Sequence, residues 1–275
     1  MPTAALLCPP TYFDVIDMKN PYMVGDSPID KEKARAQWDA LCSALQSAGI
    51  KVEIIDPVPG LEDMVFAANQ IFVGCHAEIG KFVVPSHMRY ASRQREVPYF
   101  VEWFCKRGYK ILDINLGDEY LEGAGDLIWH PDRSRIYAGY KFRTTIGAVR
   151  LLTEKMKPLG ISVTPLELID AHCYHLDTSL CPLNNDAVLI YPGAYSQESL
   201  AALHTFWKRV HELTREEALG FIGNGIVATG RYLTPRLTPN LERILTAEIL
   251  QPIVLDTSEF EKSGGSLFCM KTFLD

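Results

Sequence analysis

One arrangement recurs five times along the chain: a helix, a short turn and then a strand. Apolar residues at helical spacing predict a helix over 30–48, with Asp30 as its N-cap and Gly49 as its stop, and a strand over 51–55 follows. The same order predicts helices over 98–107, 145–159, 196–209 and 240–250, followed by strands over 109–114, 161–168, 210–213 and 253–255. The units recur about every 50 residues, a spacing that is typical of repeat architectures.

Apolar or β-branched runs lie between these units and predict further strands, over 70–73, 82–84, 127–138, 187–191, 225–229 and 267–273. The units share almost no sequence identity, so the repeat is one of pattern. Five such α/β units favour closure around an axis, with the helices outside and the functional site where strand ends converge. An open, doubly wound sheet is the alternative, and it is disfavoured because no GxGxxG turn joins a strand to a helix.

Composition limits the classes of protein that remain. The 275 residues, 47% of them hydrophobic, suffice for one large domain or two small ones. A net charge of −7 gives no support to nucleic-acid binding. It mildly favours a cationic substrate, although solubility explains it equally well. The seven cysteines form no CxxC pair and indicate a reducing compartment. No signal peptide or run of about 18 apolar residues is present, so a cytoplasmic protein without membrane contact is expected.

Cys269 stands out near the end of the chain, after the glycine pair Gly264-Gly265 and before a short apolar run that predicts a strand. A glycine pair lets the backbone turn tightly and approach a ligand closely. The simplest interpretation is a buried core cysteine. A functional interpretation gains weight from histidine and carboxylates in three other turn-bounded segments, which are Glu62-Asp63, Glu122 to Asp126 and His175-Leu176-Asp177. Cysteine with histidine is typical of thiolate catalysis, and the carboxylates indicate a cationic substrate.

A guanidinium group is a substrate that could use all of these residues. Carboxylates pair with it in bidentate fashion and fix its plane. A thiolate can attack its carbon once a nearby cation lowers the thiol pKa from about 8.5. Histidine can then protonate the departing amine and later deprotonate water.

Each of these residues also has a structural interpretation. Turn chemistry alone could account for Asp63 and for the Glu122–Asp126 segment. Alternation along a strand would place His175 and Asp177 on the same face, and His172 on the opposite face from His175. That geometry, with no second ligand pair, disfavours a zinc site, so no metal or cofactor is expected. The basic cluster Arg89, Arg93 and Arg95 is interpreted as a solvated surface, of which one member could contact a substrate carboxylate.

Taken in order, these segments resemble the guanidino-group-modifying enzymes: arginine deiminases, dimethylarginine dimethylaminohydrolases, arginine dihydrolases and amidinotransferases. The resemblance covers essentially the whole chain and implies one catalytic domain over residues 1–275, with the five-bladed α/β propeller (pentein) fold of that superfamily. The motifs that carry it are Cys8-Pro9-Pro10-Thr11-Tyr12-Phe13, Asn20-Pro21-Tyr22-Met23, Asp63-Met64-Val65-Phe66-Ala67-Ala68-Asn69, Glu122-Gly123-Ala124-Gly125-Asp126, Gly139-Tyr140-Lys141-Phe142-Arg143, His175-Leu176-Asp177-Thr178 and Gly264-Gly265 with Cys269.

The resemblance also implies roles for individual residues. Cys269 would be the nucleophile, His175 the general acid and base, and Glu122 a further catalytic residue. The guanidinium would be held by Asp63, Glu122 and Asp177, and the substrate α-carboxylate would be met by Arg143, with Arg93 as a second candidate. The Asn-Pro-aromatic-Met segment and the Phe-x-x-Asn after Asp63 look most like the arginine dihydrolase branch, where asparagines, here Asn20 and Asn69, line the site.

The resemblance leaves several functions open. The leading expectation is hydrolysis of free arginine or an Nω-methylarginine, with ornithine slightly favoured over citrulline as the product of arginine. Single-step hydrolysis of dimethylarginine is close behind, and amidino transfer to an amine is a further enzymatic alternative. The same propeller fold also serves as a ribosome-subunit anti-association factor, so a binding protein is the non-enzymatic alternative. The expected partner is a small cationic molecule, and a homo-oligomer is left open.

Overall fold

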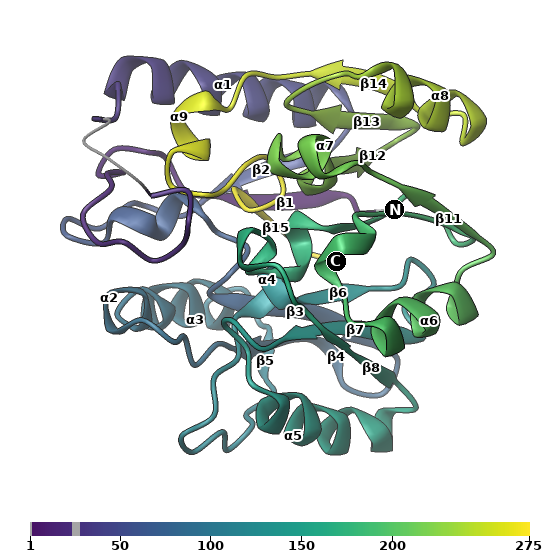
Figure 1. The fold of residues 1–275 in the computed structure, drawn as a ribbon. Coiled ribbons are helices and arrows are strands. Elements are labelled where there is room, and N and C mark those ends of the chain that lie inside the picture. Colours follow the sequence, from purple (N-terminus) through teal and green to yellow (C-terminus); the bar gives the residue numbers. More distant parts are fainter. Residues whose placement is uncertain (1, 24–27) are drawn as a thin grey trace.

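The computed structural model describes residues 2–23 and 28–275 (Figure 1). Five three-stranded sheets surround a common centre, and the longer helices lie around the outside (Figure 1). In each sheet the first and second strands are antiparallel and the second and third are parallel. A helical crossover joins the two parallel strands, because the chain must return to the same end of the sheet before the next parallel strand can begin. The predicted five-unit α/β arrangement is therefore confirmed.

The elements follow the predicted units closely. The sheets are β15 (Lys271–Phe273), β1 (Ala4–Leu7) and β2 (Lys51–Ile54); β3 (Ile71–His76), β4 (Gly80–Pro85) and β5 (Lys110–Ile111); β6 (Leu127–Trp129), β7 (Arg135–Tyr140) and β8 (Ser162–Glu167); β9 (Leu180–Pro182), β10 (Ala187–Ile190) and β11 (Arg209–Glu212); β12 (Ile226–Ala228), β13 (Arg231–Thr234) and β14 (Gln251–Val254). The crossover helices are α1 (Lys31–Ser47), α2 (Ala91–Gln94) with α3 (Val97–Cys105), α5 (Ile146–Met156), α6 (Gln197–Phe206) and α8 (Pro239–Ala247), and shorter helices are α4 (Gly123–Asp126), α7 (Arg215–Leu219) and α9 (Ser258–Glu261).

Helix α1 shows why the local sequence forms these elements. The Asp30 side chain accepts a hydrogen bond from the Lys33 backbone N–H at 3.0 Å and so caps the first turn. Trp38 and Leu41 are buried on its inner face, at helical spacing. Gly49 then adopts a φ of +79°, which favours glycine, and turns the chain into β2. Apolar clusters between each sheet and its helix form the core.

The two ends of the chain close the ring of sheets. β15 pairs with β1 in antiparallel register, with Ala5 opposite Phe273, so the last strand completes the first sheet. The Thr3 backbone N–H also donates to the Asp275 carboxylate at 2.9 Å. Strands β1, β9 and β13 were not among the predicted ones, and the run over 127–138 forms a hairpin of two strands, β6 and β7, rather than one strand.

A short turn precedes the first strand of every sheet, and these five turns meet at the centre. They are the 3₁₀ turns η1 (Glu62–Val65), η4 (Leu176–Thr178) and η6 (Ile222–Asn224), helix α4, and the turn over residues 267–270, and we call them the turn ring. Each turn, with the residues that follow it, is joined to the next by a hydrogen bond. The bonds are Ala68 N–H to Cys269 C=O at 3.1 Å, Ala124 N–H to Ala68 C=O at 2.8 Å, Leu176 N–H to Asp126 Oδ1 at 3.1 Å, Asn224 Nδ2 to Asp177 C=O at 3.0 Å, and Phe268 N–H to Asn224 C=O at 3.0 Å.

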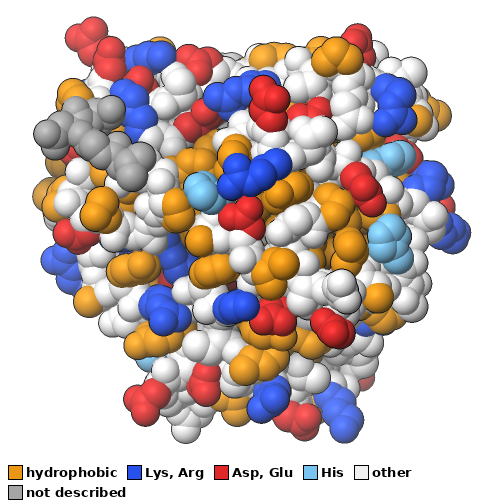
Figure 2. Space-filling model, viewed as in Figure 1, with side chains coloured by type: hydrophobic (Ala, Val, Ile, Leu, Met, Phe, Trp, Pro, Cys, Tyr) orange, Lys and Arg blue, Asp and Glu red, His pale blue; other side chains and the backbone are white. Residues whose placement is uncertain are grey.

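Basic and acidic side chains are interspersed among apolar ones on the face seen in Figure 2, without a broad patch of one sign. Among the residues that the structure describes, no helix is both long enough and apolar enough to cross a membrane.

Candidate active site

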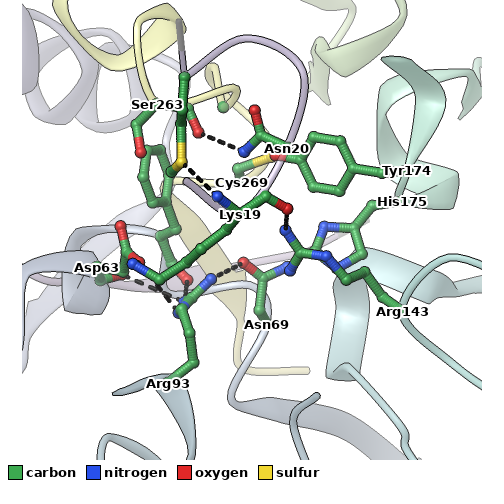
Figure 3. A pocket seen from close by; sticks show the side chains of 13 residues that line it. Lys19, Asn20, Asp63, Asn69, Arg93, Arg143, Tyr174, His175, Ser263 and Cys269 are labelled. Carbon is green, nitrogen blue, oxygen red and sulfur yellow. Dashed lines mark hydrogen bonds and ion pairs between the residues drawn. The ribbon is translucent and has the colours of Figure 1, made fainter. Parts of the chain in front are cut away.

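A small cavity opens beside the turn ring, where the predicted residues converge (Figure 3). Seven of the nine predicted site residues line it: Asn20, Asp63, Asn69, Arg93, Arg143, His175 and Cys269. Glu122 and Asp177 do not line the cavity, but each touches a residue that does. The cavity volume is about 10 Å³, which is room for about one water molecule. The chain therefore brings the predicted residues together around a nearly closed space.

Cys269 is buried in the turn over 267–270, just before β15 rather than on the strand itself. Its Sγ lies 3.1 Å from Asp177 Oδ2 and 3.2 Å from the Asn224 side-chain amide. Burial and the neighbouring Asp177 carboxylate raise the pKa of the Cys269 thiol well above its ordinary value. Burial also raises the pKa of Asp177 to about 7, although the Cys269 hydrogen bond partly offsets this. These contacts favour a Cys269 thiol that donates to the Asp177 carboxylate.

His175 and Glu122 form a buried pair. His175 Nε2 donates to Glu122 Oε2 at 2.7 Å, while Arg143 donates to the same oxygen at 3.0 Å and the Arg89 backbone N–H donates to Oε1 at 2.9 Å. Burial alone would raise the pKa of Glu122, but the Arg143 charge and the His175 hydrogen bond lower it overall. The Glu122 carboxylate is thus a permanent anion whose oxygens are already occupied, which differs from the expectation that it grips a guanidinium.

The local structure around His175 also differs from the prediction. His175 is extended, but Leu176–Thr178 form the 3₁₀ turn η4, so the predicted strand alternation is wrong. The turn forms because the Thr178 hydroxyl donates to the His175 carbonyl at 2.8 Å and the Leu176 N–H is held by Asp126. His175 and Asp177 therefore reach different partners: His175 pairs with Glu122, and Asp177 contacts the sulfur.

Asp63 is the centre of a second buried network. Lys19 Nζ lies 3.0 Å from Asp63 Oδ2 and 3.3 Å from Glu62 Oε1, and Arg93 Nε lies 3.8 Å from Asp63 Oδ2. Arg93 also binds Glu96 at 3.1 Å. The assignment of Arg93 to a solvated surface is wrong, because its side chain is only 5% exposed. Its neighbours Arg89 and Arg95 are exposed. Burying a charged arginine is costly unless carboxylates pair with it, and Glu96 and Asp63 do so here.

The guanidinium of Arg143 packs against two aromatic rings. Its guanidinium carbon lies 4.7 Å from the Tyr90 ring centroid and 4.6 Å from the Tyr174 ring centroid. Besides Glu122, it donates to the Lys19 carbonyl at 2.9 Å. The predicted contact between Arg143 and a substrate carboxylate stays a prediction. In this structure Arg143 joins the segment around Lys19 to Glu122.

The two asparagines differ in what they offer to a ligand. Asn20 Nδ2 donates to the Ser263 carbonyl at 3.0 Å, and its Oδ1 accepts from the Tyr22 N–H at 3.0 Å, so both ends of this amide are used. Asn69 Oδ1 accepts from Arg93 at 3.1 Å, which fixes the amide orientation and leaves Nδ2 without a partner. Of these two amide nitrogens, that of Asn69 is the one without a hydrogen-bond partner among the described residues.

Within the described part of the chain, three buried polar atoms of the predicted residues have no hydrogen-bond partner: Asp63 Oδ1, Asn69 Nδ2 and Asp177 Oδ1. Buried polar atoms are normally satisfied, and each exception requires an explanation. A carboxylate oxygen and an amide N–H that line the cavity, with a second carboxylate beside Cys269, fit a cationic, hydrogen-bonding ligand.

Three residues of the site were missed by the sequence analysis: Lys19, Tyr174 and Asn224. Lys19 and Tyr174 carry no motif signal, because they are placed by the fold. Asn224 could have been found, since it lies between Gly223 and Gly225 immediately before an apolar run, as the other turn residues do. His172, which prompted the zinc interpretation, pairs instead with Asp170 at 3.1 Å and is partly exposed.

Comparison with known proteins adds an independent line of support. The model of the family described as "N,N dimethylarginine dimethylhydrolase, eukaryotic" matches residues 17–273. The bifunctional arginine dihydrolase/ornithine cyclodeaminase AgrE of Nostoc is 33% identical over 96% of this chain, which spans 37% of the length of AgrE. The N(G),N(G)-dimethylarginine dimethylaminohydrolase of Mycobacterium tuberculosis is 31% identical, over 96% of this chain and 83% of that protein.

Solved structures agree with the fold. The N-terminal domain of the cyanobacterial arginine dihydrolase ArgZ, a cysteine-to-serine variant bound to its substrate, superposes with a TM-score of 0.91 and 29% identity. The match covers 98% of this chain and 97% of that one. Another variant of the same domain is covalently bonded to a reaction intermediate, again with a TM-score of 0.91. The predicted five-bladed α/β propeller is confirmed by these matches.

Proposed function

Because this chain belongs to the N,N-dimethylarginine dimethylhydrolase family, within the guanidino-group-modifying enzymes, we propose that it hydrolyses the guanidinium C–N bond of free arginine or of an Nω-methylarginine. Cys269 is the nucleophile of this reaction. The family, the covalent intermediate trapped on ArgZ, and a buried cysteine beside a His–Glu pair in this structure all support the proposal.

The first half of the reaction forms a covalent bond to sulfur. Cys269 gives its thiol proton to Asp177 Oδ2, which it contacts at 3.1 Å, and the sulfur adds to the guanidinium carbon. The bond from that carbon to a terminal nitrogen then breaks. His175 supplies the proton that leaves with ammonia, or with the methylamine of a methylated substrate. Glu122 accepts the Nε2–H bond of His175, because a carboxylate can only accept, and so holds the imidazole and stabilises its protonated form. The product on Cys269 is an S-alkylthiouronium cation.

The second half releases the sulfur. His175 takes a proton from water, the oxygen adds to the thiouronium carbon, and the C–S electron pair returns to Cys269. Asp177 then returns the thiol proton to the sulfur. One such cycle converts arginine and one water into citrulline and ammonia. Asp63 lines the cavity and Asp177 contacts Cys269, so two carboxylates lie near the nucleophile and favour a cationic carbon there.

Substrate binding precedes activation of the thiol. Burial and Asp177 raise the pKa of the Cys269 thiol, so the protonated thiol is favoured before a cation binds. A substrate cation placed against Cys269 and Asp177 would lower the pKa of the thiol through its charge. Entry of that cation requires movement, since the cavity holds about 10 Å³ and Lys19 already occupies the Asp63 carboxylate.

The amide nitrogen of Asn69, which has no hydrogen-bond partner among the described residues, is the observation that favours arginine as substrate with ornithine as product. A second cycle must hold the neutral ureido group of citrulline, which carboxylates bind poorly. The free Asn69 Nδ2 can donate a hydrogen bond to the ureido oxygen and polarise its carbon. Asn20, which was expected to help, has its amide occupied. Two cycles together convert arginine and two waters into ornithine, carbon dioxide and two ammonia.

Single-step hydrolysis of dimethylarginine is the second candidate. It is favoured by the family description and by the similarity to the Mycobacterium tuberculosis enzyme. It needs the same Cys269, His175 and Glu122, but it needs no group to repolarise a neutral product.

The ratio of ammonia released to arginine consumed separates the two candidates. We expect a ratio near two, falling toward one in Asn69→Asp, which exchanges the free donor for an acceptor. Asn185→Asp, which adds the same charge at an exposed position, is the control and should keep the ratio. A ratio of one in the unmutated protein, or preferential turnover of dimethylarginine, would assign the enzyme to the dimethylaminohydrolases.

A further inference from the structure

Asn224 is the residue that the fifth turn of the ring contributes to the site. It ends the 3₁₀ turn η6 and is fully buried. Glycines on both sides allow the turn to pack closely: a Cβ at Gly223 would lie 2.8 Å from the Thr178 carbonyl oxygen, and one at Gly225 would lie 2.3 Å from the Tyr232 ring. The backbone around Asn224 is thus pressed against η4 and β13, which fixes the position of its side chain.

Both ends of the Asn224 amide contact groups around the nucleophile. Nδ2 donates one hydrogen to Cys269 Sγ at 3.2 Å and the other to the Asp177 carbonyl at 3.0 Å. Oδ1 accepts from the Cys269 backbone N–H at 3.4 Å. The reversed amide would set oxygen against the Asp177 carbonyl and N–H against the Cys269 N–H. The orientation is therefore fixed by its neighbours, with a donor aimed at the sulfur.

We propose that Asn224 takes part in the reaction: its amide stabilises negative charge on the Cys269 sulfur and holds the sulfur in register with Asp177. This inference rests on the proposed function. The sulfur is negative at two points, before it forms the S–C bond and again when the C–S electron pair returns to it. A hydrogen bond to the charged form of a group favours that form.

The other charged groups around the sulfur do not replace this donor. Asp177, on η4, repels a thiolate. Tyr174 precedes His175 and donates its hydroxyl to the Gly264 carbonyl at 2.6 Å rather than to the sulfur. Lys271, on β15, is buried, with Nζ 3.1 Å from the Phe268 ring centroid. No hydrogen bond from Lys271 to Cys269 is present among the described residues. Asn224 is thus the side chain that donates to Sγ within this part of the chain.

The test measures how fast iodoacetamide alkylates Cys269 at a series of pH values, read by mass spectrometry of the peptide that contains it. This readout does not require turnover. Asn224→Leu removes both donors at similar volume, and Asn224→Asp keeps the shape but removes the donor. Asn184→Leu, which removes a side-chain amide in a distant network, is the matched control. Thermal unfolding of each variant shows whether it is folded.

We expect the pH midpoint of Cys269 alkylation to rise by one to two units in folded Asn224→Leu, because a hydrogen bond to a charged group is worth about 1.5–3 kcal/mol. The midpoint should rise at least as far in Asn224→Asp and stay unchanged in Asn184→Leu. We also expect kcat to fall tenfold or more in Asn224→Leu while KM changes less than twofold. An unchanged midpoint in a folded Asn224 variant would overturn the inference. A shifted midpoint in a protein that hydrolyses no guanidinium compound would instead contradict the proposed function alone.

Discussion

Two carboxylates in this molecule have nearly the same partners and very different surroundings. Glu122 accepts hydrogen bonds from Arg143 at 3.0 Å and His175 at 2.7 Å. Glu248, which follows α8, accepts from Arg209 at 2.8 Å, from His211 at 2.7 Å and from Asn184 at 2.7 Å. In both networks the arginine lowers the pKa of the glutamate, for Glu248 to about 2.

Both glutamate side chains are buried, and the two networks differ in the exposure of their arginines and in the groups that lie beside them. The Arg143 side chain is 4% exposed and that of Arg209 is 48% exposed. Unpartnered buried atoms of Asp63, Asn69 and Asp177 accompany the first network, whereas the oxygens of Glu248 are satisfied by protein donors. A His–Arg–Glu constellation is therefore not a site by itself. Burial beside unsatisfied groups distinguishes the reactive network from the structural one.

Replacing each glutamate by glutamine should give the largest difference in activity between the two networks. We expect Glu122→Gln to lower kcat for arginine by about 10²–10⁴, because general acid–base catalysis by His175 is worth about that factor. Glu248→Gln should leave kcat within about twofold and lower stability slightly, as expected for a partly exposed ion pair. Steady-state rates of both variants give the comparison. Equal losses of activity would show that the networks are not functionally distinct.

The contributions of Asp177 and Glu248 to stability should change with pH in opposite directions. Burial raises the pKa of Asp177 from 3.8 to about 7, so the folded protein binds the extra proton between these values and loses stability as pH rises through them. Asp177→Asn should therefore be more stable than the unmutated protein at pH 8, by about 2–4 kcal/mol, with little gain at pH 4. The lowered pKa of Glu248 means that its contribution is present above pH 4.5 and is lost as pH falls toward 2.

Urea unfolding of Asp177→Asn and Glu248→Gln at pH 4 and pH 8 measures both effects. A stability difference for Asp177→Asn that does not grow with pH would mean that Asp177 is ionised in the folded protein at pH 4.

Lys19 allows a test of whether a substrate cation replaces the lysine ammonium at Asp63. Its ammonium binds Asp63 at 3.0 Å inside the cavity, where it competes with a substrate cation. We expect Lys19→Met to lower KM for arginine by roughly threefold to tenfold, since the ammonium paired with Asp63 no longer has to be displaced. Lys208→Met, which removes an exposed lysine beside Asp186, is the control and should leave KM unchanged. A higher KM in Lys19→Met would show that Lys19 assists binding.

The scaffold could be predicted well because it is encoded locally. Each crossover helix carries its own apolar face and stop signal, as Asp30, Trp38 and Gly49 show for the first unit. Short strands such as β9 and β13 escaped prediction because three or four residues carry too little pattern. Of the five turn segments around the site, those that carry a cysteine, a histidine or carboxylates could be recognised from the sequence. The segment of Asn224 carries none of these and was missed.

The detailed roles within the site could not be read from the sequence, because they depend on distances between remote segments. Nothing local distinguishes Arg93, buried against Glu96, from its exposed neighbours Arg89 and Arg95. His175 and Asp177 were expected to share one face of a strand, but the 3₁₀ turn at 176–178 sends them to different partners. The space occupied by Lys19 likewise depends on the path of an N-terminal segment across the turn ring.

Turnover by Cys269→Ala tests the central claim most directly, namely that the turn ring presents Cys269 as a nucleophile. The variant is offered arginine, monomethylarginine and dimethylarginine separately, beside Cys181→Ala, which removes a buried cysteine elsewhere in the core. We predict no detectable hydrolysis by Cys269→Ala with substrate binding retained, because carboxylates rather than sulfur hold the cation, and near-normal hydrolysis by Cys181→Ala. Turnover of any of these substrates by Cys269→Ala at more than a few per cent of the unmutated rate would contradict the account.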